Sequence, residues 1–399
     1  MITDNEITSM LQRFIEKYNR PPIMGVRAPG RVNLIGEHTD YNQGFVFPAA
    51  IEREIRILAS PISVPELRMY SMNYEQYRVV PLTELEFSKD MPWSNYICGV
   101  VDELIKAGYT PGGCEMLIWG DIPIGAGLSS SAAIEVASAC MFRRLFNLFD
   151  ISDRELALIA QKAENNFIGV NCGIMDQFVS LMGWDNHALL IDCKSLNAML
   201  VPIPRRGKIS IVICNSKVPR ELTDSEYNRR REECEEGLRL LKEKFPSITS
   251  IRDVLPGMWE EIEHTIPMPV RKRCRHVIYE NQRTLDAAEA LKNDNPEFFG
   301  ELMNLSHKSL KDDFEVSRPE LDCLVSAAWE IEECFGSKLT GAGFGGCTVS
   351  LVENSGIERF KEHLKTRYME NFSREPDFVI TQATSGASLL RIPHAIPLL

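Results

Sequence analysis

A glycine- and serine-rich segment, PIGAGLSSSAA at residues 123–133, stands directly before a run with helical periodicity over 129–148. Its glycines let the backbone approach a ligand closely, because glycine has no Cβ atom. Its three consecutive serines can take the N-cap and first turn of the helix, where N–H groups lack partners within the helix. Such a helix start attracts anions. The segment therefore predicts either a well-capped helix without a ligand or a phosphate-binding loop.

Two familiar nucleotide-binding loops do not fit the chain. The Gly-Lys-Ser/Thr ending of a Walker A loop is absent from residues 123–133, so the cation that balances phosphate charge comes from elsewhere or is Mg²⁺. A second glycine-rich segment, 341–346, matches the letters G-x-G-x-x-G but leads into the β-branched run 347–352. A dinucleotide fingerprint opens a helix instead. A loop packed against a ligand and a tight turn between strands both remain open for this segment.

Composition narrows the class of protein. The 399 residues carry a formal net charge of −12, which argues against nucleic acid or an anionic membrane as the main partner. No uninterrupted apolar run reaches the ~18 residues of a membrane span, and residues 1–10 lack the pattern of a signal peptide. The 11 cysteines include no C-x-x-C pair and are typical of reduced thiols. We expect a cytoplasmic protein.

The order of predicted elements indicates two α+β domains. Strand-like runs and helical stretches alternate up to about residue 200, and a capping box, Ser152-x-x-Glu155, opens a helix that runs to about Asn165. Prolines and a glycine over 202–207 suggest a boundary, so the domains are expected at 1–205 and 206–399. Further helices are predicted at 225–244, 271–292, 296–310 and 319–334.

A third segment, residues 31–44, groups the polar side chains of Arg31, Glu37, His38 and Asp40 between apolar flanks. Each carboxylate can accept hydrogen bonds from two hydroxyl groups, so the pair suits a sugar. The alternative is a surface loop with an internal Arg–carboxylate pair, which contributes little to stability.

These segments carry a family resemblance. Residues 30–44 (GRVNLIGEHTDYNQG) resemble the galactokinase signature, and residues 123–133 resemble the ATP motif of the GHMP kinase superfamily, which includes homoserine and mevalonate kinases. Residues 339–349 (LTGAGFGGCTV) resemble the third motif of that superfamily. The order and spacing agree with galactokinases, as does CGIMDQF at 172–178. The resemblance covers nearly the whole chain, except that 248–270 is not placed.

The resemblance implies a reaction and a fold. The reaction is transfer of the γ-phosphoryl group of MgATP to the 1-hydroxyl of α-D-galactose, giving galactose 1-phosphate and ADP. The fold is the two-domain GHMP kinase fold, with an N-terminal domain like ribosomal protein S5 domain 2 and a ferredoxin-like C-terminal domain. The expected partners are galactose and MgATP, with no nucleic acid and no membrane, and a monomer is expected.

The resemblance also implies the site residues. Asp176 stands beside the anomeric hydroxyl, which it deprotonates or merely orients, and Arg31 lies between Asp176 and the γ-phosphate. The expected Mg²⁺ ligands are Ser131 and Glu164. The sugar contacts map to Glu37, His38, Asp40, Gly173, Asp176 and Tyr227. The nucleotide contacts map to Trp93, Tyr96, Pro123, Gly125, Ala126, Gly127, Leu128, Ser129, Ser130 and Ser131.

Two alternatives belong to the same family. Some members phosphorylate N-acetylgalactosamine or other sugars, and their signatures depart from the His-Thr-Asp-Tyr-Asn kept at 38–42. Others are sugar-sensing transcriptional regulators without catalysis, which lose residues of the serine-rich motif. That motif is complete at 129–133, which favours an enzyme.

Overall fold

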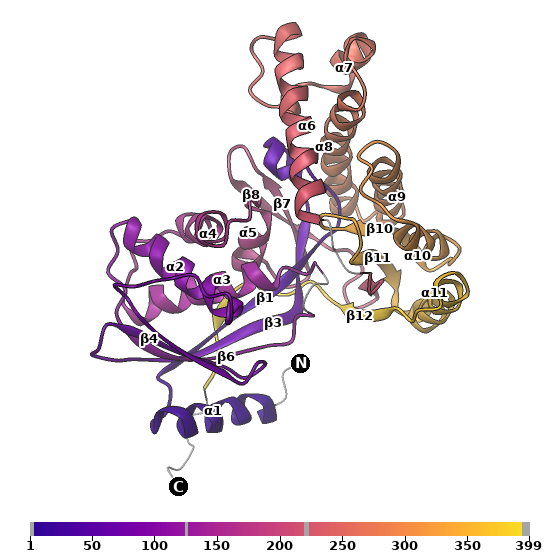
Figure 1. The fold of residues 1–399 in the computed structure, drawn as a ribbon. Helices are drawn as coiled ribbons and strands as arrows, with labels where there is room; N and C mark the ends of the chain where they lie inside the picture. Colours follow the sequence, from indigo (N-terminus) through magenta and orange to yellow (C-terminus); the bar gives the residue numbers. More distant parts are fainter. Residues whose placement is uncertain (1–3, 124–126, 219–222, 393–399) are drawn as a thin grey trace.

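The computed structural model describes residues 4–123, 127–218 and 223–392, which form three β-sheets with helices packed against them (Figure 1). The fold is α+β, as predicted. The largest sheet has six strands in the order β13-β1-β3-β6-β4-β5, and among them only β4 and β6 run parallel. Its strands are β1 (Met24–Asn33), β3 (Pro48–Pro61), β4 (Glu66–Ser71), β5 (Gln76–Pro81), β6 (Cys114–Gly120) and β13 (Ser388–Leu389).

Helices cover both faces of this sheet (Figure 1). On β3, Ile57 and Ala59 point into the core under the main helical layer, whereas Leu58 between them points to the other face. This alternation is the ordinary two-residue period of a strand. Met10 and Phe14 of the first helix pack against Leu58. The first helix is α1 (Asp4–Tyr18), and the main layer holds α2 (Asn95–Lys106), α3 (Ser130–Leu145), α4 (Asp153–Lys162) and α5 (Met175–Met182).

The helix opened by Ser152 differs from its prediction at the C-terminal end. Ser152 caps it as expected, since its side chain accepts a hydrogen bond from the N–H of Glu155 at 3.2 Å. The α-helix ends at Lys162, and the chain continues as a π-helical turn, Ala163–Ile168. A wider turn of this kind changes the direction of the following side chains, and π-turns are frequent at functional sites.

Two smaller sheets follow along the chain. A three-stranded sheet has the order β2-β7-β8, and a four-stranded antiparallel sheet has the order β10-β11-β9-β12. Their strands are β2 (Phe45–Val46), β7 (His187–Asp192), β8 (Asn197–Pro202), β9 (Ile209–Asn215), β10 (Cys334–Thr340), β11 (Cys347–Glu353) and β12 (Asp377–Thr381).

The four-stranded sheet buries both faces. On β9, Ile211 and Ile213 share a cluster with Phe299, whereas Val212 between them packs with Leu324 and Phe360. The three aromatic and aliphatic partners come from α9 (Pro296–Asp312), α10 (Pro319–Trp329) and α11 (Ile357–Phe372). The helix predicted over 319–334 stops at Trp329, because the chain enters β10 at Cys334.

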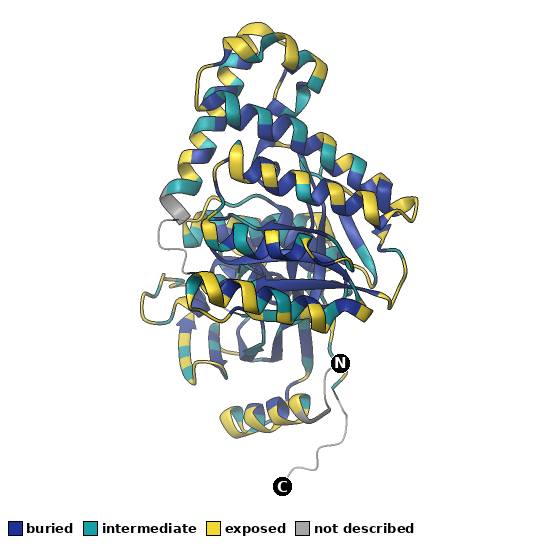
Figure 2. Cartoon of the chain, turned by 90° about the vertical axis from the view of Figure 1, so that its right-hand side faces the viewer, coloured by how far each residue is buried: buried dark blue, intermediate teal, exposed yellow. Residues whose placement is uncertain are grey.

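A helical projection rises beyond the sheets (Figure 1). It is built from α6 (Thr223–Lys244), α7 (Pro256–Ile262) and α8 (Val270–Lys292). The segment 248–270, which the resemblance leaves unplaced, contributes the buried Trp259 to the apolar core of this projection, which also holds Cys234 and Cys274. Figure 2 shows the outer helix faces exposed, whereas central strands such as β3 and β9 are mostly buried.

The last described residues return to the first sheet. Ser388 and Leu389 of β13 pair with Arg27 and Val26 of β1. Within the described ranges, no helix combines the length and the apolar character needed to cross a membrane. All 11 cysteines are free thiols, as predicted.

Candidate active site

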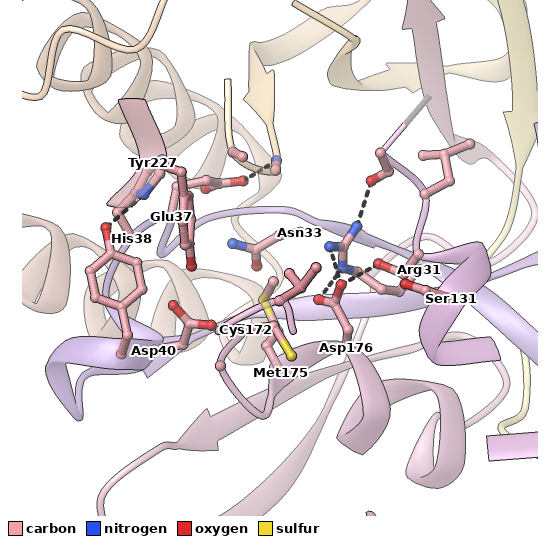
Figure 3. A pocket seen from close by; sticks show the side chains of 18 of the residues that line it. Arg31, Asn33, Glu37, His38, Asp40, Ser131, Cys172, Met175, Asp176 and Tyr227 are labelled. Atoms are coloured by element: carbon pink, nitrogen blue, oxygen red, sulfur yellow. Dashed lines mark hydrogen bonds and ion pairs between the residues drawn. The ribbon is translucent and has the colours of Figure 1, made fainter. Parts of the chain in front are cut away.

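One cavity of about 320 Å³ collects most of the predicted site residues (Figure 3). Its lining comes from the end of β1, the loop after β1, the start of α3, the segment from the π-turn to α5, Tyr227 of α6, and the loop between β10 and β11. Each contributing segment is a strand end, a helix start or a loop.

Arg31 and Asp176 form the centre of the cavity. The Arg31 side chain donates from Nε to Asp176 Oδ1 at 2.7 Å and from Nη2 to Asp176 Oδ2 at 2.6 Å. Its third nitrogen, Nη1, donates to the carbonyl of Gly127 at 2.7 Å. A two-bond pair between guanidinium and carboxylate fixes both groups in one plane. Asp176, in the first turn of α5, is thereby aimed at the glycine-serine loop.

The start of α3 is open. Ser129 stands at the N-cap with φ of 60°, and its side chain makes no cap hydrogen bond. Its hydroxyl donates instead to Asp176 Oδ2. The first-turn N–H groups of α3 thus lack the usual side-chain partner at the N-cap. The serines take the positions that the sequence predicts, and the cap geometry leaves these donors available for an anion.

The other end of the cavity is rich in carboxylates. Burial raises the pKa of Glu37 to about 7, although the adjacent Lys338 opposes the shift. Burial also raises the pKa of Asp40 to about 6, and the charge of Asp176 adds to the effect. Gly173 makes room for Asp40, because a Cβ atom on Gly173 would lie 1.8 Å from Asp40 Oδ2. The signature segment therefore faces the cavity and is not a surface loop.

His38 is buried between aromatic rings at this end. Its Nδ1 lies 2.8 Å from the hydroxyl of Tyr41, and its ring centroid lies 5.9 Å from that of Tyr227. Burial lowers the pKa of His38 to about 3, so the imidazole is neutral at physiological pH. A neutral imidazole offers one donor and one acceptor to a polar ligand.

Glu164 enters the cavity from the π-turn. Burial raises its pKa, and the charge of Asp176 raises it further. Gln177 donates from Nε2 to Glu164 Oε2 at 2.8 Å and to Glu135 Oε2 at 3.0 Å. Three acidic groups, Glu135, Glu164 and Asp176, thus lie near one another, and the Arg31 guanidinium pairs with Asp176. A cation bound beside these groups would favour their ionised forms, because an opposite charge lowers the pKa of a carboxyl group.

The cavity unites thirteen of the predicted residues and leaves others outside it. Trp93 lies in the core with its Nε1 donating to Gln76 at 2.8 Å, and Tyr96 packs against the same core. Neither lines the cavity, and nor does Pro123; Gly125 and Ala126 fall outside the described residues. The predicted residues that line it are Arg31, Glu37, His38, Asp40, Gly127, Leu128, Ser129, Ser130, Ser131, Glu164, Gly173, Asp176 and Tyr227.

Further lining residues were not predicted as contacts. Asn33 is fully buried, and its Nδ2 has no hydrogen-bond partner (Figure 3). Tyr41, Cys172 and Met175 also face the cavity. Each lies inside a segment already singled out, so position within the motif is the only signal that points to it. Gly341 belongs to the loop that follows β10, which is both a turn between strands and part of the cavity wall.

An anion site at a helix start beside a polar cavity has the parts that a kinase for small molecules needs. The family profile described as the GHMP kinases N terminal domain matches residues 95–184, and the GHMP kinases C terminal profile matches 287–371. A mevalonate kinase crystal structure has a TM-score of 0.62 over 91% of this chain and 99% of that chain at 20% identity, a likeness of fold. The chain has the GHMP kinase fold.

Closer relatives narrow the family. The profile described as the galactokinase galactose-binding signature matches residues 12–61. A galactokinase of Roseiflexus sp. is 47% identical over 94% of this chain and 95% of its own length. A galactokinase of Chloroflexus aurantiacus is 42% identical over 96% of this chain and 97% of its own. The Lactococcus lactis galactokinase, solved in complex with galactose, has a TM-score of 0.92 at 38% identity and covers 96% of this chain and 100% of that chain. The chain belongs to the galactokinase family, and its function is that of an ATP-dependent sugar kinase.

Proposed function

We propose that this chain transfers the γ-phosphoryl group of MgATP to the anomeric hydroxyl of α-D-galactose, giving α-D-galactose 1-phosphate and ADP. The observation that carries the proposal is the Arg31–Asp176 pair. It stands between a carboxylate-rich end of one cavity and the open N-terminus of α3. A sugar at the first end and a phosphate chain at the second would meet at this pair.

Asp176 orients the anomeric hydroxyl and accepts its proton as that oxygen forms a bond to the γ-phosphorus. Arg31 faces the charge that spreads over the transferring phosphoryl group. Positioning of the reactants contributes most of the rate enhancement in such a reaction, because a loose transition state does not require a strong base. The two hydrogen bonds from Arg31 support this role, since they restrict the Asp176 carboxylate to one orientation.

Glu37, His38, Asp40, the backbone of Gly173 and Tyr227 bind the sugar hydroxyls. All five line the cavity. A site built on carboxylates and a neutral imidazole rejects an epimer strongly, because a misplaced hydroxyl leaves buried polar groups unpaired. This is the basis on which we expect galactose to be favoured over glucose.

We propose that Mg²⁺ is held by Ser131 and Glu164. A hydroxyl and a carboxylate are hard oxygen donors of the kind Mg²⁺ takes, with phosphate oxygens and waters completing the shell. The described residues include no group of three His, Cys, Asp or Glu placed to hold a metal by themselves. When bound, the ion would balance phosphate charge. Ser131 and Glu164 both line the cavity, and Glu164 is nine-tenths buried among acidic groups that a cation would offset.

The rest of the nucleotide site is proposed on the family resemblance. Trp93 and Tyr96 flank the adenine, and the segment 123–131 surrounds the phosphates. Burial raises the pKa of Tyr96 to about 12, and the nearby charges of Glu164 and Glu135 add to the effect.

We further propose the division into domains 1–205 and 206–399, a monomer, and the cytoplasm as its compartment. The division is supported by β8, which ends at Pro202 in one sheet, and β9, which begins at Ile209 in another. The strand β13 is the exception, because it belongs to the first sheet. Eleven free thiols favour a reducing compartment. The molecular mass of the purified protein in analytical ultracentrifugation tests whether it is a monomer.

The experiment that tests the reaction is a panel of sugars in a coupled ADP-release assay with MgATP. We expect galactose to be turned over fastest, with glucose and N-acetylgalactosamine far slower. Faster turnover of N-acetylgalactosamine would replace galactose as the substrate. Sugar binding without turnover of any member of the panel would contradict the catalytic roles of Asp176 and Arg31.

A further inference from the structure

A buried ion pair joins the four-stranded sheet to the sugar end of the cavity. Lys338 Nζ of β10 donates to Glu37 Oε2, across 301 positions of sequence, and to the carbonyl of Leu339 at 2.8 Å. The exposed fractions of the two side chains are 0% for Lys338 and 2% for Glu37. A fully buried lysine is rare unless it is paired, because its charge loses the solvation of water. The pair therefore calls for a reason beyond packing.

The geometry separates the two partners of this pair. Glu37 lines the cavity, whereas Lys338 does not. Glu37 Oε2 is taken by the lysine, and Oε1 lies 3.4 Å from the N–H of Gly341 at the cavity wall. The Glu37 carboxylate therefore connects Lys338 to a bound sugar most directly.

The backbone around Glu37 is held by other groups. The carbonyl of Glu37 lies 3.1 Å from His276 Nε2, and the N–H of Gly36 donates to Glu280 Oε1 at 3.0 Å, both on α8. The titratable groups that face Glu37 are thus Lys338 from β10 and His276 and Glu280 from α8, with His38 as its chain neighbour. Of these, Lys338 alone makes a hydrogen bond to the carboxylate itself. Loss of the lysine should leave the loop in place and disturb only the carboxylate.

We propose that Lys338 is a positioning residue for sugar binding, which favours the ionised form of the Glu37 carboxylate and holds it in the orientation that sugar hydroxyls meet. The inference rests on the proposed function, in which Glu37 is a sugar ligand. A buried carboxylate deprived of its counter-charge either takes up a proton or turns away. Both responses weaken its hydrogen bonds to hydroxyl groups, because an ionised acceptor binds more strongly than a neutral one.

The electrostatics give the proposal a pH signature. Burial raises the pKa of Glu37 to about 7, and the charge and hydrogen bond of Lys338 work against that rise. Without the lysine, burial acts with less opposition, so the carboxylate gains its proton at a higher pH. Weakening of sugar binding on acidification should therefore begin at a higher pH in a Lys338 variant than in the wild-type protein.

The test compares Lys338→Met and Lys338→Arg in steady-state kinetics with galactose and MgATP. We expect Lys338→Met to raise KM for galactose about tenfold, the size typical of weakening a hydrogen bond to a charged group. KM for MgATP should stay within about twofold of wild type, and the pH inflection of KM for galactose should move upward. Lys338→Arg keeps the charge and should restore most of the affinity. An unchanged KM for galactose, or an equal rise for both substrates, overturns the proposal.

A matched control separates positioning from general destabilisation. Arg56 of β3 is also a buried cation, 3% exposed, paired with Glu54 outside the cavity. Arg56→Met should lower the melting temperature and leave KM for galactose unchanged. A rise in KM with Arg56→Met equal to that with Lys338→Met would assign the effect to lost stability.

Glu37→Gln and the double variant Glu37→Gln/Lys338→Met separate this inference from the proposed function. If Glu37→Gln leaves KM for galactose unchanged, Glu37 is no sugar ligand and the proposed function is wrong at this residue. If Glu37→Gln raises KM but Lys338→Met does not, only the positioning role fails. The double variant should match Glu37→Gln alone. The double variant removes both charges of the buried pair, so it remains a test if Lys338→Met alone does not fold. A KM for galactose higher in the double variant than in Glu37→Gln contradicts the proposal.

Discussion

The Asp176 carboxylate receives three hydrogen bonds, two from Arg31 and one from Ser129. We expect Asp176→Asn to reduce kcat by about two orders of magnitude or more, since general-base and charge-pairing contributions to catalysis are of this size. Galactose binding should remain measurable, because the substitution does not change the residues that bind the sugar hydroxyls at the other end of the cavity. Coupled ADP release gives kcat, and calorimetric titration with galactose gives the affinity.

Asp192 provides a matched control for this variant. It also pairs with an arginine through both oxygens, Arg252 being its partner, and its side chain is 23% exposed against 24% for Asp176. Asp192 lies outside the cavity, so Asp192→Asn should leave kcat near that of wild type. A near-normal rate for Asp176→Asn would remove Asp176 from the catalytic role.

Sugar binding should depend on pH through the two signature carboxylates. Their pKa values, about 7 for Glu37 and about 6 for Asp40, lie above the ordinary values, so both groups gain protons as the pH falls. We expect KM for galactose to rise from about pH 8 to about pH 5.5 at saturating MgATP, since the ionised acceptors are lost over this range. His38, with a pKa of about 3, stays neutral and adds no inflection. A flat profile would contradict a sugar-binding role for these carboxylates.

Among the elements of the site, the turn before α5 has room for the Asp40 carboxylate only because residue 173 is a glycine. A Cβ atom at Gly173 would lie 1.8 Å from Asp40 Oδ2 and 2.4 Å from its Cγ. We expect Gly173→Ala to push Asp40 aside and raise KM for galactose about tenfold or more, with a smaller effect on KM for MgATP. Steady-state kinetics with each substrate varied in turn measures both.

Gly257 of α7 is the control for Gly173. A Cβ atom at Gly257 meets nothing within 4 Å, and its helix lies at the outer end of the helical projection (Figure 1) and contributes no residue to the cavity. Gly257→Ala should leave both KM values unchanged and slightly stabilise the protein, because alanine favours a helix over glycine. If Gly173→Ala behaves in the same way, the close packing at Asp40 does not control the sugar site.

The elements of the site were predictable where local patterns specify them. The serines before α3 and the cap at Ser152 follow from residue types next to one another in sequence. The π-turn that carries Glu164 was not predicted from the sequence, because its geometry depends on packing around residues 163–168 and not on their composition. The ion pair of Glu37 with Lys338 was missed for a similar reason, since the two residues are 301 positions apart and only the folded chain joins them.

At the scale of the whole molecule, the C-terminal segment completes the first sheet. The N–H of Leu390 donates to the carbonyl of Gly25 at 2.9 Å, and Arg27 Nε donates to Ser388 Oγ at 3.0 Å. Leu390 and Ile392 also pack against the cluster beneath α1. We expect deletion of residues 384–399 to lower the melting temperature by about 5 °C or more, since several contacts of about 1 kcal/mol each are lost.

Leu389→Ala is the control for this deletion. The Leu389 side chain is 55% exposed, and the substitution keeps the backbone pairing of β13, so the melting temperature should change little. Thermal unfolding followed by circular dichroism measures both variants. An unchanged melting temperature on deletion would show that the pairing of β13 contributes nothing to stability.

The overall organisation was predicted more fully than this closing strand. Two α+β halves follow from the alternation of strand and helix patterns along the chain. The strand β13 has two residues, too few for any periodicity, and its partner β1 lies near the other end of the sequence. Such a pairing depends on where the exposed edge of the folded sheet lies, so it cannot be predicted from the local sequence.

This pairing has a consequence for synthesis on the ribosome. The edge of β1 that pairs with Ser388 and Leu389 has no partner from that strand until those residues emerge, 361 positions after Arg27 in the case of Ser388. During that interval the nascent sheet presents an open strand edge, which is a surface prone to pairing with other chains. The six-stranded sheet therefore reaches its full set of strands only after residues 388–389 have been made.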